Sequence, residues 1–351
     1  MGKKVMKRVL LNGCEAAAEG AIAAGCTFYA GYPITPQNRF PEYMSMRMPE
    51  IGGDFIQAES ELAAVNMVFG AAVAGARALT SSSSPGISLK QEGISYLAGC
   101  ELPAVIVNMN RGGPGLGDVT PSQSDYFQST RGGGHGDYRT IVLAPWSVQE
   151  LYDFTYQAFD LADRYRNPVL ILADGIIAQV MEPVKFRTGV KKLPAKKWAL
   201  NGCKGRKPNL IRSLFLTPGV LETHNWKLAR KYERIEKREK RHECYFCDDM
   251  TMLVVSYGTC GRIVKEAVEM ARSDGLKVGL FRPVSVWPFP YEELRRCVDR
   301  VKKVLVVEMN LGQMLDDVKI AARDTARIFF YGRPGGGIPT PEEILKEIKK
   351  R

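Results

Sequence analysis

The chain has 351 residues, enough for two domains with sizeable cores, and its 45% hydrophobic and 25% charged residues are typical of an ordinary globular protein. No run of about 18 apolar residues occurs, so we expect no membrane-spanning helix. The basic start of the chain leads into a short apolar run that Asn12, Glu15 and Glu19 interrupt. We therefore expect no export signal and a cytoplasmic location.

The net charge of +11 comes from one segment of the chain. Residues 185–243 contain 18 Lys or Arg but only 5 Asp or Glu, so the remainder is close to neutral. The segment lacks the interleaved aromatic residues and known motifs of nucleic-acid binders, and we expect no nucleic-acid partner. A contact with a more acidic partner chain fits this charge better.

Residues 1–184 predict an α/β domain, because buried apolar strands alternate with helices as in a parallel sheet covered on both faces. Asn12 is a candidate cap for its first helix. The expected strands are 27–30, 78–80, 104–108, 140–144 and 168–173, and the expected helices include 15–24, 61–74 and 147–165.

Residues 185–248 break this pattern and predict a basic linker and docking arm with an exposed helix over 226–241. Residues 249–351 predict a second, smaller α/β unit. Its expected strands are 252–256, 278–281 and 304–308, its turn is 258–262, and its helices include 263–273. Thr340, Pro341 and Glu343 form the start signal of the last helix.

Three features follow one another over residues 31–93. They are a turn that presents the Thr35 hydroxyl, Glu61 at the start of an Ala- and Gly-rich helix, and a Ser-Pro-Gly turn at 84–86 after an apolar strand. Further Gly-rich stretches follow at 110–117 and 132–137.

In this order the motifs resemble the alpha subunit of the 2-oxoacid:ferredoxin oxidoreductases, closest to the branched-chain, 2-oxoisovalerate (3-methyl-2-oxobutanoate) type. The resemblance rests on Gly31–Gln37, Gln57–Glu61, Ser81–Gly93, Asn110–Gly117, Pro121–Asp125, Gly132–Asp137, Arg282–Phe289 and Glu308–Met314. It implies a pyrimidine-type parallel-sheet domain of the thiamine-diphosphate enzymes plus a smaller domain like the transketolase C-terminal one. The family's enzymes convert a 2-oxoacid and coenzyme A to acyl-CoA and CO2 and pass two electrons to ferredoxin.

Thiamine chemistry needs a carboxylate that bonds to the aminopyrimidine ring and turns it into an internal base. The resemblance gives this catalytic and cofactor-binding role to Glu61, with Glu59 as the second candidate. The alternative is that Glu61 only favours a helix N-terminus.

By the same resemblance, Arg111 and Thr35 bind the 2-oxoacid, because a guanidinium grips a carboxylate with two donors. A surface ion pair and a simple turn residue are the respective alternatives. Pro33, Ser84 and Gly86 are expected to shape the cofactor pocket. His135 is a possible proton donor, although a structural role remains open.

The segment that holds diphosphate and metal is missing, because Gly-Asp-Gly followed about 25–30 residues later by Asn does not occur. Asp174-Gly175 and Gly136-Asp137 are partial echoes. The resemblance therefore implies a beta subunit that completes the thiamine diphosphate and Mg²⁺ site, and gamma and ferredoxin-like subunits that carry iron–sulfur clusters. A 2-oxoglutarate or pyruvate enzyme, or a scaffold subunit without catalysis, are the alternatives.

Eight cysteines are spread along the chain without the spacing of a ferredoxin cluster. Cys244 and Cys247, with His242 and Cys203, offer four zinc-type ligands, but a single Cys-x-x-Cys is a weak signal. We expect no metal ligands in this chain.

Overall fold

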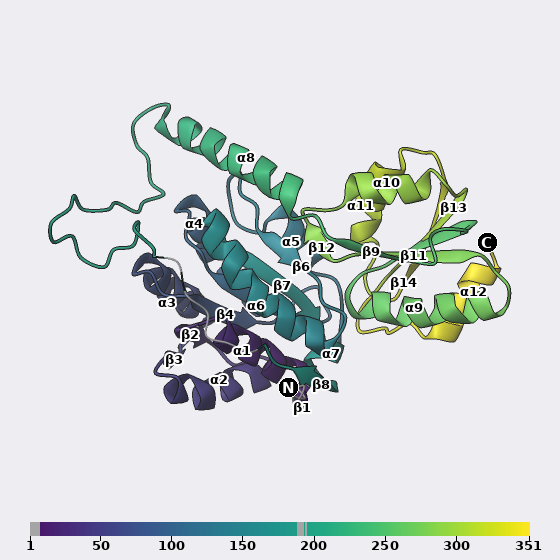
Figure 1. Cartoon of the computed structure of the whole chain (residues 1–351), viewed down its shortest axis with the longest axis horizontal. Helices are drawn as coiled ribbons and strands as arrows, with labels where there is room; N and C mark the ends of the chain where they lie inside the picture. Colours follow the sequence, from purple (N-terminus) through teal and green to yellow (C-terminus); the bar gives the residue numbers. More distant parts are fainter. Residues whose placement is uncertain (1–7, 188–192, 194) are drawn as a thin grey trace, which may run out of the picture.

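The computed structural model describes residues 8–187, 193 and 195–351, and it contains two α/β units side by side (Figure 1). The first unit is built on a sheet with the strand order β12-β6-β7-β5-β4-β2-β3, in which only β12 is antiparallel to its neighbour. Its strands are β2 (Phe28–Gly31), β3 (Asp54–Gln57), β4 (Ala78–Ser82), β5 (Val105–Asn110), β6 (Ile141–Leu143), β7 (Val169–Asp174) and β12 (Ser285–Trp287). The predicted parallel sheet is confirmed.

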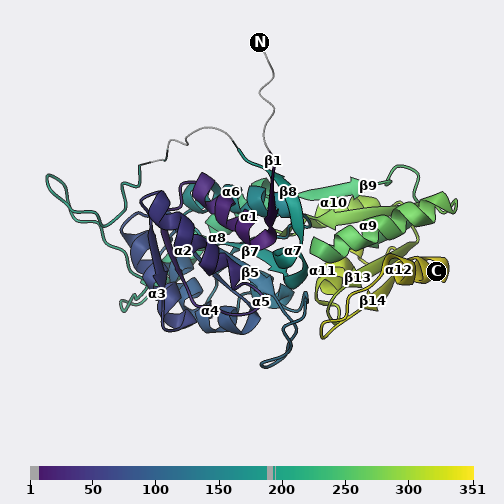
Figure 2. The same cartoon turned by 90° about the horizontal axis from the view of Figure 1, so that it is seen from below.

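Helices cover both faces of this sheet (Figure 2). One face carries α1 (Gly13–Ala23), α2 (Arg39–Glu50) and α6 (Val148–Tyr165), and the other carries α3 (Glu61–Val73) and α4 (Ser84–Gly99). Two short helices, α5 (Tyr126–Arg131) and α7 (Gly175–Gln179), complete the unit. The expected cap of α1 is present, because Asn12 Oδ1 accepts from Glu15 N at 2.9 Å and the Glu15 carboxylate accepts from Asn12 N at 3.1 Å.

The second unit has a five-stranded sheet with the order β14-β13-β10-β11-β9. Its strands are β9 (His242–Tyr245), β10 (Met252–Val255), β11 (Val278–Pro283), β13 (Lys303–Glu308) and β14 (Arg327–Gly332). Its helices are α9 (Gly258–Ser273), α10 (Tyr291–Val298), α11 (Gln313–Ala322) and α12 (Pro341–Lys349), with α9 and α12 on one face and α10 and α11 on the other (Figure 1). The expected turn at 258–262 is wrong, because these residues form the first turn of α9.

The boundaries between the two units differ from those expected at residues 184 and 249, because short strands from outside each expected range join its sheet. Residues 242–245, which we placed in the arm, form the edge strand β9 of the second sheet, and residues 285–287 return to the first sheet as β12. The expected exposed helix is α8 (Val220–Arg238), which buries Leu228, Tyr232 and Ile235 and is therefore packed along one side. Residues 195–219 form a long loop (Figure 1). Its first part packs against the first unit, because Lys196 Nζ donates to Ala76 O at 3.1 Å and Leu200 N donates to Val73 O at 2.9 Å. Within the described part of the chain, β1 (Arg8–Asn12) and β8 (Met181–Lys185) form a separate two-stranded antiparallel sheet.

Gln123 joins the two units. Its backbone N–H donates to Met309 O at 3.1 Å, and its side chain donates to Tyr257 O at 2.9 Å and accepts from Met309 N at 3.0 Å. All of these side-chain bonds are buried, so they hold the units in one relative orientation. None of the helices in the described part of the chain is long and apolar enough to cross a bilayer.

Candidate active site

A buried chain of hydrogen bonds holds the loop that follows β2 in place. Ser81 Oγ donates to Gln37 Oε1 at 2.6 Å and lies 2.8 Å from the Tyr29 hydroxyl, and Gln37 Nε2 donates to Tyr32 O at 3.1 Å. Thr35, within this loop, is exposed at the carboxyl edge of the sheet, where ligands of open α/β sheets bind.

Glu61 is the first residue of α3, directly after the cap residue Ser60, whose Oγ accepts from Ala63 N at 3.1 Å. Its side chain points into the protein, since the residue is only 5% exposed. The helix N-terminus favours its negative charge. Its carboxylate makes no hydrogen bond or ion pair with the described residues, and its oxygens are not among the fully buried atoms, so a ligand can reach them.

Gly86 lies against this carboxylate. A Cβ at position 86 would be 2.6 Å from Glu61 Oε1 and would overlap Ser82 Oγ, so only glycine leaves the acid where it is. The expected Ser-Pro-Gly turn is wrong as a free-standing turn, because Ser84, Pro85 and Gly86 form the first turn of α4. A proline is well tolerated there, since its missing N–H would have no helical partner.

Lys90 is a site residue that sequence reasoning missed. It stands one helical turn after Gly86 on α4, is fully buried, and donates from Nζ to the backbone oxygen of Glu61 at 3.2 Å. Burial lowers the pKa of Lys90 to about 8, against the opposing attraction of the Glu61 charge. The available signal was the spacing of four residues, which puts Gly86 and Lys90 on one face of a helix.

The structure brings Arg111 and Thr35, two separate candidates, into contact. Arg111 Nη1 donates to Thr35 O and Nη2 donates to Leu116 O, both at 3.0 Å, and Nε is buried without a partner. The side chain makes no ion pair among the described residues. The alternative of a surface ion pair is therefore wrong, and the guanidinium is held by loop carbonyls with its charge available to an anion.

Ser84 supports the backbone of Arg111 through a hydrogen bond. Its Oγ accepts from Arg111 N at 3.0 Å and lies 2.7 Å from Asp125 Oδ2, which also accepts from Asn108 Nδ2 at 2.8 Å. Burial raises the pKa of Asp125, and the bonds from Asn108 and Ser84 oppose this. This network supports the backbone that carries Arg111; Asp125 and Asn108 were not predicted, because their contact crosses two loops.

Buried polar atoms without a partner gather at this same edge of the sheet. They are Thr80 Oγ1, Ser82 Oγ, Ser83 Oγ, Asn108 Oδ1, Asn110 Nδ2 and Arg111 Nε. Buried polar groups in native proteins are nearly always paired, so this cluster indicates a ligand or partner surface. Together with the unpaired Glu61 carboxylate, these groups fit the aminopyrimidine of thiamine diphosphate.

The partial echoes of a diphosphate motif do not form one. Asp174 caps α7 by accepting from Ile176 N at 2.9 Å and Ile177 N at 3.3 Å, and Asp137 lies in an exposed loop. The residues described here therefore provide the pyrimidine side of a thiamine site and not the diphosphate side.

Glu59 and His135 lie apart from this constellation. Glu59 is exposed in the loop before α3, whereas Glu61 is buried. His135 is exposed and packs edge-on against Tyr96, ten residues after Gly86 along α4, or about 15 Å at the usual helical rise. Pro33 is exposed in the same loop as Thr35.

A cleft adjoins the site between the first turn of α4, the loop 112–115 and the second unit. It is lined among others by Ser84, Gly113, Asn310 and Gln313. A ligand at the sheet edge therefore has both units within reach.

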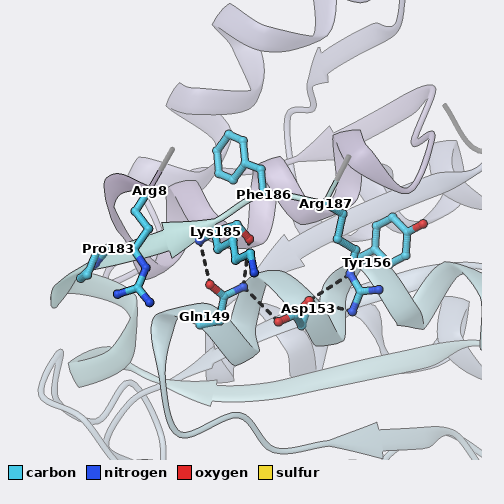
Figure 3. Close-up of a pocket in the computed structure, with 8 residues that line it drawn as sticks. All are labelled: Arg8, Gln149, Asp153, Tyr156, Pro183, Lys185, Phe186 and Arg187. Carbon is cyan, nitrogen blue, oxygen red and sulfur yellow. Dashed lines mark hydrogen bonds and ion pairs between the residues drawn. The ribbon is translucent and has the colours of Figure 1, made fainter. Parts of the chain in front are cut away.

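A larger hollow lies elsewhere, between α6 and the β1–β8 pair (Figure 3). Its polar side chains bond to one another: Arg187 pairs with Asp153 at 2.8 Å, and Gln149 bonds to Asp153 and to the backbone of Lys185. Glu61 is not among its lining residues, so we do not assign the chemistry to it.

An α/β sheet with a buried glutamate opening a small-residue helix, facing a glycine of the next helix, defines a pyrimidine-binding domain of a thiamine-diphosphate enzyme. Comparison with known proteins refines this class. The sequence profile described as "Pyruvate flavodoxin/ferredoxin oxidoreductase, thiamine diP-bdg" matches residues 19–244, and that of "Pyruvate:ferredoxin oxidoreductase core domain II" matches 251–344. The chain belongs to this family of 2-oxoacid oxidoreductases.

Among its relatives, the ketoisovalerate oxidoreductase subunit VorB of Methanothermobacter marburgensis is 48% identical over 348 residues, covering 98% of both chains. The 2-oxoglutarate synthase subunit KorA of Methanothermobacter thermautotrophicus is 39% identical, covering 97% of this chain and 98% of that one. A solved 2-oxoglutarate:ferredoxin oxidoreductase from Magnetococcus marinus superimposes with a TM-score of 0.88 at 27% identity, covering 99% of this chain and 66% of that chain. A split-gene transketolase, at 12% identity and a TM-score of 0.60, shares the fold.

The expected family and fold class are thus confirmed. The chain is a subunit of a 2-oxoacid:ferredoxin oxidoreductase that uses thiamine diphosphate.

Proposed function

We propose that this chain is the alpha subunit of a 2-oxoisovalerate:ferredoxin oxidoreductase, and that it supplies the pyrimidine side of a thiamine site which a partner chain completes. The reaction converts the 2-oxoacid and coenzyme A to acyl-CoA and CO2, with two electrons passed to ferredoxin. The observation that carries this proposal is the buried, unpaired Glu61 carboxylate against Gly86.

Thiamine diphosphate, when bound, would supply the carbanion chemistry of the reaction. Glu61 would hold its aminopyrimidine by a charge-assisted hydrogen bond, worth about 1.5–3 kcal/mol, and would so favour the tautomer that acts as a base. Lys90 keeps a positive charge beside that acid and tethers its backbone.

Arg111 and Thr35 receive the substrate carboxylate. The guanidinium is positioned by the carbonyls of Thr35 and Leu116, so its remaining donor capacity and its charge face the loop that carries the Thr35 hydroxyl. A charged hydrogen bond of this kind contributes about 1.5–3 kcal/mol to substrate binding.

The branched-chain substrate is supported by the order of similarity. The relatives named ketoisovalerate oxidoreductase are 47–48% identical, those named 2-oxoglutarate synthase 37–39%, and the pyruvate synthase subunit PorA of Thermotoga maritima 29%. Because one methylene in an apolar pocket is worth only about 1–3 kcal/mol, the competing 2-oxoacids belong in the same assay.

We further infer a beta subunit with the diphosphate and Mg²⁺ site, gamma and ferredoxin-like subunits with iron–sulfur clusters, and ferredoxin as electron acceptor. The relatives are named as subunits, which supports a multi-chain complex. Residues 195–219 of the arm expose four leucines within the basic segment, namely Leu200, Leu210, Leu214 and Leu216. Such apolar exposure favours a role in docking a partner chain. All eight cysteines are free thiols, which supports the cytoplasm as the location.

The test is steady-state turnover of the purified complex with 2-oxoisovalerate, 2-oxoglutarate and pyruvate, with coenzyme A and a low-potential dye. Glu61→Gln keeps the size of the side chain but removes its charge, and Glu59→Gln, two residues away and exposed, is the matched control. We expect the highest kcat/KM with 2-oxoisovalerate, a loss of about 10- to 150-fold in Glu61→Gln, and little change in Glu59→Gln.

Two results would contradict the proposal in different ways. Full activity of Glu61→Gln means that the acid only starts a helix and that this chain is a scaffold. A preference for 2-oxoglutarate or pyruvate, abolished in Glu61→Gln, keeps the thiamine site and overturns the substrate.

A further inference from the structure

Three cysteines from separate parts of the chain meet in the second unit. Cys244 lies in the edge strand β9, Cys247 follows that strand, and Cys297 lies in α10. Their sulfur atoms all lie within 4.8 Å of one another, and Sγ of Cys244 is 3.9 Å from Sγ of Cys297. Sequence spacing linked Cys203 and His242 to the Cys-x-x-Cys pair, but the structure brings Cys297 to it, 50 residues further on.

The surrounding backbone is shaped to hold the three sulfurs together. Phe246, between the paired cysteines, adopts a left-handed conformation with φ of 56°, which is rare for an aromatic residue. Gly279 of β11 leaves space for the turn, because a Cβ there would be 3.2 Å from Cys247 Sγ and 3.1 Å from Phe246 O. This turn directs both thiols of the pair toward Cys297.

Cys244 is exposed while Cys247 and Cys297 are buried, so solvent and an entering ion can reach the cluster from one side.

We propose that Cys244, Cys247 and Cys297 bind a thiophilic divalent cation, Zn²⁺ being the best fit, with the fourth position open toward solvent. Soft thiolates select zinc over magnesium or calcium, and zinc accepts four tetrahedral ligands at about 2.3 Å from each sulfur. A disulfide uses two cysteines and leaves the third without a role, whereas a metal uses all three.

A metal at this site would join the end of the arm, residues 242–247, to the second unit. β9 is the edge strand of its sheet, and among the described strands it is hydrogen-bonded to β11 on one side. A metal bound to β9, to the turn after it and to α10 joins this strand to a helix from a distant part of the chain. Because α8 leads directly into β9, the metal also fixes where the packed part of the arm ends.

The experiment measures zinc in the whole complex, purified under reducing conditions from cells supplied with zinc. Plasma mass spectrometry should give about one zinc per copy of this chain, and zinc X-ray absorption should show sulfur neighbours near 2.3 Å. Zinc and not iron is the readout, because iron–sulfur clusters of partner chains contribute iron only.

Cys244→Ser and Cys297→Ser should each lose most of this zinc. Cys203→Ser is the matched control, since Cys203 is an exposed cysteine of the arm outside the cluster, and it should keep the zinc. If the variants fail to fold, the sulfur neighbours of zinc in the unaltered complex still decide the question.

Three outcomes overturn the proposal: zinc at background level in the unaltered complex, zinc retained in both cluster variants, or a Cys244–Cys297 disulfide found by mass spectrometry in the reduced preparation.

Discussion

Replacing Gly86 with alanine tests the geometry of the site without altering any group that takes part in the chemistry. The added Cβ would stand 2.6 Å from Glu61 Oε1. Ordinary van der Waals contact begins at about 3.4 Å, so the carboxylate oxygen must withdraw by about 0.8 Å. Ser82 Oγ, also in the way, has no hydrogen-bond partner and is free to rotate aside.

The expected effect on catalysis follows from that displacement. A misplacement of about 1 Å in a catalytic constellation costs about 100-fold in rate, or about 2.7 kcal/mol of transition-state stabilisation. The effect on folding is smaller. Alanine favours a helix over glycine by about 1 kcal/mol, which offsets part of the overpacking strain of about 1–3 kcal/mol. Gly86→Ala should therefore remain folded and lose activity.

Gly70→Ala is the matched control, because Gly70 lies in α3, the helix that Glu61 opens, and a Cβ there meets no heavy atom within 4 Å. The assay is kcat/KM of the complex with its 2-oxoacid, coenzyme A and dye, with urea unfolding to confirm that each variant is intact. We expect about a 100-fold loss for Gly86→Ala and less than a twofold change for Gly70→Ala.

A double variant shows whether the loss acts through Glu61. If it does, adding Gly86→Ala to Glu61→Gln should reduce activity little further, since the two changes remove the same interaction. Activity of Gly86→Ala within threefold of the unaltered enzyme, or full additivity in the double variant, would refute the assigned position of the carboxylate.

Three further predictions concern other parts of the protein. Arg111→Lys, which replaces the planar two-donor guanidinium by a single ammonium, should raise KM for the 2-oxoacid about 10-fold or more. Glu59→Lys is the control and should leave KM unchanged. An unchanged KM for Arg111→Lys would exclude Arg111 from substrate binding. Lys90→Met should remove a pH dependence of stability. Because the pKa of Lys90 is about 8 in the folded state against 10.5 in the unfolded chain, the unfolded chain binds more protons between these values, and the free energy of unfolding of the unaltered protein should rise relative to that of the variant by about 1.4 kcal/mol per pH unit from about pH 8. The same difference in free energy of unfolding between the two proteins at pH 7.5 and pH 9.5, measured in urea, would contradict this. Gln123→Ala leaves the buried backbone N–H of Met309 unpaired, whereas Tyr257 O keeps its bond from Gly261 N, and should lower the free energy of unfolding by about 1–3 kcal/mol in urea titrations, against less than about 1 kcal/mol for Gln128→Ala at an exposed bond.

The parts of the fold that sequence could predict are those with local signals. The apolar run of β5, the cap at Asn12 and the Thr340–Glu343 start of α12 each depend on neighbouring residues, and each is where the pattern indicated. The exchange of β9 and β12 between the units depends on tertiary pairing. Neither strand is longer than four residues, and no periodicity of such short segments tells which sheet they join.

The same distinction holds for the site. Glu61, Thr35 and Arg111 were candidates because each sits in a motif, and the structure adds the contact between Arg111 and Thr35. Lys90 was not predicted as a site residue, because a single lysine within a helix is usually exposed to solvent. Its burial follows from the packing of α4 against α3, which the sequence does not show. The contact of Cys297 with Cys244 likewise crosses 53 positions of sequence, which no spacing rule covers.

Unpaired buried polar groups gather where the proposed cofactor would bind. The buried atoms without a partner at the ends of β4 and β5 lie beside a buried carboxylate that is itself unpaired. Each such group costs about 1–3 kcal/mol when it remains unsatisfied, so the isolated chain carries a local instability at this edge of the sheet. Whatever binds there recovers that free energy. Under the proposed function, a cofactor whose ring bonds to Glu61, and whose other end is held by a second chain, stabilises the assembly as well as serving the reaction. Thermal unfolding of the complex should accordingly respond to added thiamine diphosphate, and this response should be smaller in Glu61→Gln than in Glu59→Gln.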